Sequence, residues 1–475
     1  MQDALRDVGT GLDKRALVYD AKQDVLPLLD KISPHAEIIT LNPFDARGAY
    51  WDLCRDVREP RVAVELAFTL IPSEHESQPF FSNASRHLLY GVVLSYMLSG
   101  HHWTFADLIR GLARPKRLKA ILKRHPETRD IIARYFHDER LLDNIFSTIA
   151  AKLLPLESVA AAWESAQRGV SLEEWSQGES ILVMGNSEIS RSAIDAINRA
   201  IFKRATDYIL GQSESFTRRT WFILDELSEC GKLDGLVSIL KKGRSRGACV
   251  SINFQTISGL RDNHLYGPYL ADEILGQIGN HFFGRLEDPE TSDRASKLFG
   301  DQEIDQYTTN NTWGGQGGST TTRSQQVVTR RTVLPSEFMS ADPCNRENGL
   351  TGYYRTRTQG NLVGNLPGDG LFDHDLIPPS PDVPAFVPRE VSAQLLKPWT
   401  KEQAQKFGVK FKAEPLVVEP QPELAPEPEP VPNPVPDAIV VVSPPLPVPP
   451  PAPVPAPPKR KPDLSQLDDM DNLFL

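Results

Sequence analysis

The sequence predicts an α/β fold, a doubly wound and mostly parallel sheet with an all-helical insertion and a disordered, proline-rich carboxyl-terminal tail. Short apolar runs that end in polar residues alternate with helical periodicity, which is typical of a parallel sheet covered by helices. One long internal stretch carries only the helical period. The last part of the chain loses periodicity and is dominated by proline, which is typical of an extended spacer.

The predicted strands are short, predominantly apolar segments. They are Ala16–Tyr19, Glu37–Leu41, Ile181–Gly185, Trp221–Leu224, Cys249–Phe254 and His281–Leu286. Such segments are typical of strands that are buried on both faces of a parallel sheet. Helices are expected between the later strands, near residues 193–210, 233–242 and 269–279. In this kind of sheet the functional residues are expected at the carboxyl ends of the strands.

The chain divides into four predicted parts. Residues 1–79 begin the sheet domain, 80–166 form the helical insertion, 167–377 complete the sheet domain and 378–475 form the tail. Within the third part, Thr308–Thr322 is rich in glycine, threonine and asparagine. We expect it to be a mobile loop, because it has too little apolar content to pack.

The tail is defined by its proline content. Between Pro415 and Pro462 roughly every second or third residue is proline, which favours an extended polyproline-type conformation. Its last segment, Asp463–Leu475, combines acidic and apolar residues that could line one face of a short helix on a partner protein. A disordered, solubilising end is the open alternative.

Composition limits the function classes only loosely. The net charge of −10 by itself argues against a nucleic-acid partner, but Ala413–Leu475 alone carries ten acidic and three basic residues. The rest of the chain is therefore near neutral and can hold a local basic groove. The four cysteines are scattered, which favours buried thiols in a reducing compartment over a metal site. Because no run of about 18 uncharged apolar residues and no signal peptide is found, the chain as written is expected to be cytoplasmic.

The strongest chemical signal is a pair of carboxylates after a buried strand. Asp225 and Glu226 directly follow Trp221–Leu224. Nucleotide hydrolases use such a pair, one carboxylate to hold magnesium through water and one to orient the attacking water. If the next strand along the chain is a neighbour, Gln255 could sense a terminal phosphate or the attacking water. A strand that ends in Asp-Glu by chance is the alternative.

Two groups of cations are candidates for phosphate contact. Lys241, Lys242, Arg244 and Arg246 surround the end of a predicted helix. They could contact phosphate, on DNA or across a subunit interface, or they could simply be the cations that a helix carboxyl terminus favours. The helical insertion carries a second group that includes Arg117 and Lys119. This group is either a DNA-backbone contact or solvated helix surface.

An ordered series of motifs resembles the type IV secretion system coupling protein family, the conjugative TraD/TraG group within the FtsK/HerA class of ring translocases. The matching segments are Leu17–Leu29, Leu41–Leu53, Ser171–Asn186, Phe222–Leu260, Gly284–Gly300 and Val333–Phe338. The helical segment also falls where this family inserts an all-helical domain into its sheet.

The resemblance implies a RecA-like P-loop ATPase that forms a homo-hexameric ring, binds ATP and Mg²⁺, and pumps DNA to a secretion channel. It implies a relaxase or relaxosome as partner and, in full-length members, an inner-membrane anchor. By position, Asp225 would be the Walker B carboxylate that holds Mg²⁺ and Glu226 the residue that activates water. Gln255 would be the phosphate sensor, and Arg285 an arginine finger supplied to the neighbouring subunit.

One family motif is missing from the sequence. No segment reads G-x-x-x-x-G-K-[ST], the phosphate-binding loop. In the family this loop comes before the strand that aligns with Ala16–Asp20, where the sequence has only Met1–Arg15. Without the loop, the triphosphate and Mg²⁺ lose most of their binding groups. We expect an amino-terminal truncation. Two alternatives stay open: an FtsK/HerA-like DNA translocase, against which the helical insertion argues, and a non-hydrolysing DNA- or protein-binding adaptor.

Overall fold

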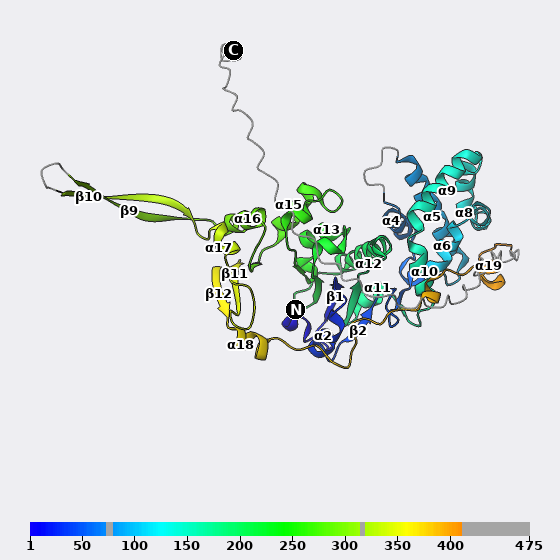
Figure 1. Cartoon of the computed structure of the whole chain (residues 1–475). Helices are drawn as coiled ribbons and strands as arrows, with labels where there is room; N and C mark the ends of the chain where they lie inside the picture. The colour runs from blue at the N-terminus through cyan, green and yellow to red at the C-terminus, as the bar shows by residue number, and fades with distance from the viewer. Residues whose placement is uncertain (73–78, 314–318, 411–475) are drawn as a thin grey trace, which may run out of the picture. The chain divides into compact units, whose positions relative to one another are not determined.

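The computed structural model describes residues 1–72, 79–313 and 319–410 (Figure 1). Its centre is a five-stranded parallel sheet in the order β2-β5-β1-β6-β7. The strands are β1 (Lys14–Asp20), β2 (Glu37–Thr40), β5 (Ser180–Gly185), β6 (Arg219–Leu224) and β7 (Ala248–Ile252). The chain starts in the middle of the sheet and builds outward on both sides, which confirms the predicted doubly wound class.

Both faces of the central strand β1 are buried, which explains the apolar run Ala16–Tyr19 within it. In β1, Ala16 and Val18 belong to one core, with α1 (Gln2–Leu5) and α2 (Val25–Ile32). Leu17 and Tyr19 point to the other face, where they join the core that includes α12 (Arg191–Gly211). Successive side chains of a strand alternate between faces, so a strand with helices on both sides needs apolar residues at every position.

The last predicted strand belongs to a different sheet. β8 (His281–Phe283) pairs antiparallel with β11 (Leu350–Thr356), which in turn pairs with β12 (Gly360–Leu366). The expectation that this strand continues the parallel sheet is therefore wrong. The physical reason is its one-sided burial: Phe283 packs on Phe338, whereas Phe282 is about half exposed. One buried and one solvated face are typical of antiparallel sheets.

The predicted mobile loop at Thr308–Thr322 is also wrong for its described residues. β9 (Asp301–Trp313) and β10 (Ser319–Arg331) form a long antiparallel hairpin, visible as a two-stranded ribbon in Figure 1. Its ladder satisfies the backbone N–H and C=O groups without a packed core, and threonine, a β-branched residue, fits this conformation. Residues 314–318 lie outside the described part of the chain.

Residues 80–164 contain only helices and turns. The helices are α5 (Phe80–Ser99), α6 (Phe105–Leu112), α7 (Pro115–Leu122), α8 (Pro126–Tyr135), α9 (Glu139–Leu153) and α10 (Leu156–Glu164). Proline at the first position of α7 and α8 begins each helix, where its missing N–H costs nothing. Among the described helices, none alone is long and apolar enough to cross a membrane; α9 and α10 reach that length only together, with a bend of 63° between them.

Shorter elements connect these parts. They are β3 (Tyr50–Trp51), α3 (Leu53–Asp56), α4 (Pro60–Leu70), β4 (Gly169–Val170), α11 (Leu172–Gln177), η1 (Leu227–Cys230), α13 (Leu236–Lys242), η2 (Arg244–Arg246), α14 (Ile257–Leu260), α15 (Gly267–Gln277), α16 (Pro289–Phe299), α17 (Pro335–Met339) and α18 (Gly368–Gly370). The short α14 leads away from the sheet after β7 and brings the chain to α15.

A few side chains between residues 378 and 410 are buried against the rest of the chain, which differs from the expected tail at 378–475. Arg389 is buried and donates to the carbonyl oxygens of Pro43, Asp45 and Gly48 at 2.9, 2.8 and 3.1 Å. Further on, the buried Trp399 donates its indole N–H to Asp107 at 2.7 Å. These contacts could not be predicted from the sequence, because single buried side chains in an irregular segment produce no periodicity. Residues 411–475, with the proline-rich spacer and the acidic-apolar end, lie outside the described residues.

Candidate functional site

The carboxyl edge of the parallel sheet, where its strands end, holds the predicted carboxylate pair. Asp225 and Glu226 follow β6, and Asn253 follows the neighbouring β7. Two backbone hydrogen bonds continue the pairing past the strand ends: Asn253 N–H donates to Leu224 O at 3.0 Å, and Leu227 N–H donates to Asn253 O at 2.8 Å. These bonds fix Asp225 beside Asn253.

Each carboxylate of the pair is half-buried and has one hydrogen-bonded oxygen. Asn253 Nδ2 donates to Asp225 Oδ1 at 3.4 Å, and Ser228 Oγ donates to Glu226 Oε1 at 2.5 Å. Within the described residues, the second oxygen of each carboxylate accepts no hydrogen bond. Oxygen ligands of this type fit a hydrated magnesium ion, which keeps several waters and takes one or two protein carboxylates.

Gln255 does not reach the carboxylates in the described structure. Its side chain is exposed, and the amide that contacts Asp225 belongs to Asn253. The strand was predicted to extend to Phe254, but β7 ends at Ile252, so the first polar residue past its end is Asn253. Sequence reasoning missed Asn253 because of this boundary; the role of Gln255 as a phosphate sensor stays a prediction.

A buried carboxyl group ends the central strand at the same edge. Asp20, the last residue of β1, accepts hydrogen bonds from the backbone N–H groups of Asp24 at 3.1 Å and Val25 at 3.3 Å. Burial raises the pKa of Asp20 to about 6, against these hydrogen bonds, which act to lower the pKa. The carboxyl group therefore titrates near pH 6. It lies two strands away from Asn253 in the sheet.

Arg191, the first residue of α12, connects α12 to η1 at this edge through hydrogen bonds. Arg191 donates to Asp195 at 3.1 Å, to Glu229 Oε2 at 2.5 Å and to the Glu229 carbonyl at 2.7 Å. The Tyr19 hydroxyl also donates to that carbonyl, at 2.6 Å. Burial raises the pKa of the Asp195 carboxyl, partly offset by Arg191. Arg191 is thus a positioning residue that holds η1 and its flanking carboxylates in place.

Arg285 lies elsewhere in the fold. It follows β8, in the antiparallel sheet, and its Nε donates to Glu287 at 2.7 Å. Its charge is therefore balanced within its own chain in this conformation. Its assignment as an arginine finger stays a prediction.

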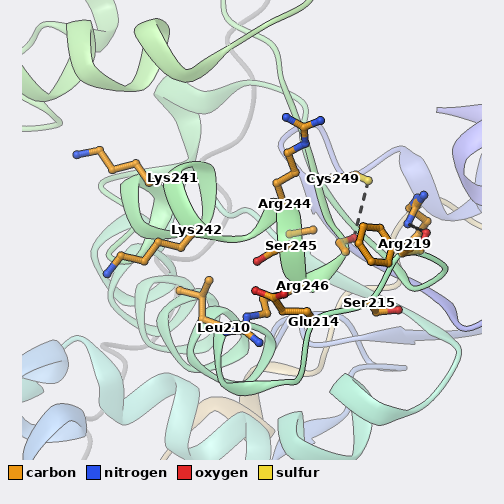
Figure 2. Close-up of a pocket in the computed structure, with 13 residues that line it drawn as sticks. Leu210, Glu214, Ser215, Arg219, Lys241, Lys242, Arg244, Ser245, Arg246 and Cys249 are labelled. Carbon is orange, nitrogen blue, oxygen red and sulfur yellow. Dashed lines mark hydrogen bonds between the residues drawn. The ribbon is translucent and has the colours of Figure 1, made fainter.

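The cations around the end of α13 gather at the opposite edge of the sheet, where β6 and β7 begin. Lys241, Lys242, Arg244 and Arg246 line a pocket of about 990 Å³ together with Arg219, the first residue of β6 (Figure 2). Lys241 forms an ion pair with Glu273. The sheet thus separates the carboxylate pair from this basic pocket.

The other two candidate DNA-binding cations have intramolecular partners. Arg117 donates to the carbonyl of Arg110 at 2.8 Å, and its guanidinium lies 5.0 Å from the centre of the Trp399 ring. Lys119 Nζ lies 5.6 Å from the centre of the Phe136 ring. These contacts give both cations a structural role, and contact with DNA stays a prediction for them.

Fold and site together define an α/β protein with a parallel sheet and with adjacent carboxylates at the carboxyl end of one of its strands, β6. A family model described as the type IV secretion-system coupling protein DNA-binding domain matches residues 2–354. The chain belongs to this family of conjugative coupling proteins.

Curated relatives and solved structures agree with this assignment. The chain is 21% identical to the coupling protein TraD of Escherichia coli (strain K12) over 392 residues, which cover 80% of this chain and 51% of TraD. It is 27% identical to the conjugal transfer protein TraG of Rhizobium radiobacter over 152 residues, 32% of this chain and 22% of TraG. The chain thus spans about half the length of TraD.

Two solved structures of the conjugative coupling protein TrwB have a similar fold. Unbound TrwBdeltaN70 superimposes with a TM-score of 0.59 at 20% identity, over 79% of this chain and 81% of that one. TrwB in complex with the non-hydrolysable ATP analogue ADPNP gives a TM-score of 0.58 at 20% identity, over 79% and 82%.

Proposed function

We propose that this protein is an ATP-dependent coupling protein of bacterial conjugation that binds DNA and delivers it to a type IV secretion channel. The observation that carries the proposal is the position of Asp225 and Glu226 at the carboxyl end of β6, in a chain that matches the coupling protein family. Structures of the similar protein TrwB with ADPNP and with ADP and Mg²⁺ support nucleotide as the ligand.

The described residues fit the metal better than the triphosphate. Asp225 would hold Mg²⁺ through water, and Glu226, kept in place by Ser228, would orient the attacking water. Mg²⁺ would neutralise charge on the phosphate oxygens. The printed sequence contains no G-x-x-x-x-G-K-[ST] segment, so the groups that would cradle the triphosphate are not among the described residues.

The family also suggests an assembly. We propose a homo-hexameric ring at the inner membrane, with a relaxase-bound DNA as cargo, in which Arg285 reaches the neighbouring subunit's nucleotide. The relatives named as a coupling protein and as conjugal transfer proteins support this setting. For Arg285 to act in this way, it must first leave Glu287.

DNA transfer between cells tests the proposal in the protein's own host. Glu226→Gln and Asp225→Asn keep side-chain shape but remove the charge, and each is expected to lower the frequency of conjugative transfer by at least about 100-fold. Glu303→Gln, on the exposed hairpin strand β9, is the matched control and should transfer like the wild type. Wild-type transfer by Glu226→Gln at equal protein level would contradict the proposal.

The missing phosphate loop favours one alternative, a non-hydrolysing adaptor that binds DNA or protein. The two functions differ in one measurable property, because an adaptor needs no carboxylate pair. Transfer that depends on the presence of the protein but not on Asp225 and Glu226 would identify the adaptor.

A further inference from the structure

The strand β12 is exposed along its whole length. It is the outer strand of the small sheet β12-β11-β8 (Figure 1), and all of its residues, Gly360–Leu366, are exposed. Its pairing with β11 continues without a bulge from one end of the strand to the other. No described strand pairs with its outer side. The N–H and C=O groups on that side are therefore available to another strand.

This edge strand carries none of the features that normally protect an edge. Soluble proteins place charges, proline or a bulge on exposed edge strands, because a flat edge is a template for pairing with another chain. The sequence of β12, GNLVGNL, contains neither a charge nor a proline. By contrast, the exposed hairpin strand β9 carries Asp301, Glu303 and Asp305. The composition of β12 is thus typical of a strand that has a partner.

One face of the small sheet is apolar and open to solvent. Phe282, Tyr354 and Leu362 lie opposite one another on the three strands and therefore share this face. Phe282 is 49% exposed, and Leu362 and Leu366 are each 43% exposed. The other face of the sheet differs, because its Tyr353 is buried in the core with α16 and α17. A contiguous exposed apolar face is typical of an interaction surface.

A gap lies next to Leu362 on the same face. Gly364 follows two residues later, and a Cβ built at this position would meet no atom within 4 Å. Its φ is also outside the left-handed region, so the backbone of one copy does not require glycine here. A glycine within a strand often marks the close approach of another chain. Gly364 leaves such a space at the free edge.

The sequence of β12 is complementary to itself around this gap. When two copies of the strand pair antiparallel about a twofold axis at Val363, Leu362 lies opposite Gly364 of the second copy. In the same register, Leu366 lies opposite Gly360 of the second copy. Residues that lie directly opposite share a face of the sheet, so each leucine fills the space that a glycine leaves.

The charges beyond the two ends of β12 fit the same arrangement. Arg357 lies three residues before the strand and Asp369 three residues after it, and both are exposed. Neither side chain forms an ion pair with another described residue. Antiparallel pairing brings Arg357 of each copy to the end of the strand where Asp369 of the other copy lies. Exposed charges of this kind add little affinity, but they favour one orientation of the two strands.

We propose that β12 pairs antiparallel with β12 of a second copy of the chain, so that the two small sheets join into one. This contact has twofold symmetry and therefore differs from the head-to-tail contacts that would close the proposed ring. It does not depend on the proposed function. Because a single pair of short strands is smaller than a standard interface of roughly 1,600 Å², we expect a weak dimer with a Kd in about the micromolar range.

Sedimentation velocity of the full 475-residue chain, without nucleotide and over a range of concentrations, tests this pairing. The wild type should change from monomer to dimer as its concentration rises. Gly364→Lys places a long charged side chain where Leu362 of the second copy would lie, and should weaken the dimer at least about tenfold. Because a Cβ at Gly364 meets no atom of its own chain, this variant should melt like the wild type.

Gly276→Lys is the matched control. Gly276 is exposed on α15, and a Cβ there also meets no atom within 4 Å. This variant adds the same charge outside the small sheet and should dimerise like the wild type. Circular dichroism and thermal melting check that both variants are folded.

Disulfide cross-linking tests the register. The background is Cys344→Ser, which removes an exposed thiol and should stay unlinked under mild oxidation. Val363→Cys should form a linked dimer, because a residue on the twofold axis lies within disulfide reach of its own copy. Asn361→Cys should not, since its two copies lie four positions apart, about 13 Å along the strands.

Three outcomes would overturn the proposal. A wild type that stays monomeric at about 100 µM would exclude a micromolar dimer. Association that Gly364→Lys leaves unchanged would place the contact elsewhere on the chain. Cross-linking through Asn361→Cys but not through Val363→Cys would exclude this register. None of these outcomes bears on the carboxylate pair, so each would leave the proposed function intact.

Discussion

The side chains at the carboxyl edge differ in how visible they are in the sequence. Asp225 and Glu226 stand out because they interrupt an apolar run, and the structure places them at the end of β6, as predicted. Asn253 and Arg191 carry no such signal, since their roles depend on which strands and helices are neighbours. Gly185 likewise looks ordinary, yet a Cβ there would lie 2.3 Å from the side chain of Asn42. Local sequence thus identifies the reactive groups but not the residues that position them.

The raised pKa of Asp20 makes the stability of the protein depend on pH. Because the folded protein holds this proton up to about pH 6 and the unfolded chain loses it near pH 4, stability falls as pH rises through this window. Asp20→Asn removes the effect and should raise the free energy of unfolding at pH 7.5 by about 2 to 3 kcal/mol, with little change at pH 4. Thermal melting of both proteins at pH 4 and pH 7.5 measures this difference in stability. Asp30→Asn, an exposed carboxylate on α2, should show no such pH dependence.

At the scale of elements, the buried strands were predictable and the exposed ones were not. β1, β2, β5, β6 and β7 occur where their apolar runs predict them, because burial on both faces leaves a strong signal. β9 and β10 have no buried face along most of their length, so their polar composition resembles that of a loop. β8 was found as a strand but placed in the wrong sheet, since composition does not specify the partner.

The strap formed by residues 378–410 contributes to the stability of the helical segment. Trp399 is buried and hydrogen-bonded to Asp107. Its ring centroid lies 5.6 Å from that of Phe407, and the Phe407 centroid lies 4.3 Å from that of Tyr96. Trp399→Ala should therefore lower the free energy of unfolding by about 3 to 5 kcal/mol. Trp399→Phe keeps most of the packing but loses the hydrogen bond, so it should lower the free energy of unfolding by only about 1 to 2 kcal/mol.

Urea unfolding followed by circular dichroism, combined with limited proteolysis, measures the contribution of this strap. The Trp399→Ala variant should be cleaved within residues 378–410 at protease levels that leave the wild type intact, because the strap is released. Equal unfolding curves and equal cleavage for both proteins would show that the strap is not packed in solution.

At the scale of the whole molecule, the parallel sheet separates two chemistries. Its carboxyl edge gathers the carboxylates Asp225 and Glu226 beside Asn253, and its amino edge gathers cations, of which Lys241 is paired with Glu273. The sheet is a rigid element, so binding at one edge can reach the other only through the strands β6 and β7 and the helices packed on them.

The rate of ATP hydrolysis by protein purified from its host, with and without single-stranded DNA, tests this account most directly. Glu226→Gln should lower hydrolysis by at least about 100-fold and keep the wild-type affinity for DNA. Hydrolysis by Glu226→Gln at the wild-type rate would contradict the central claim that the carboxylate pair after β6 is the hydrolytic site.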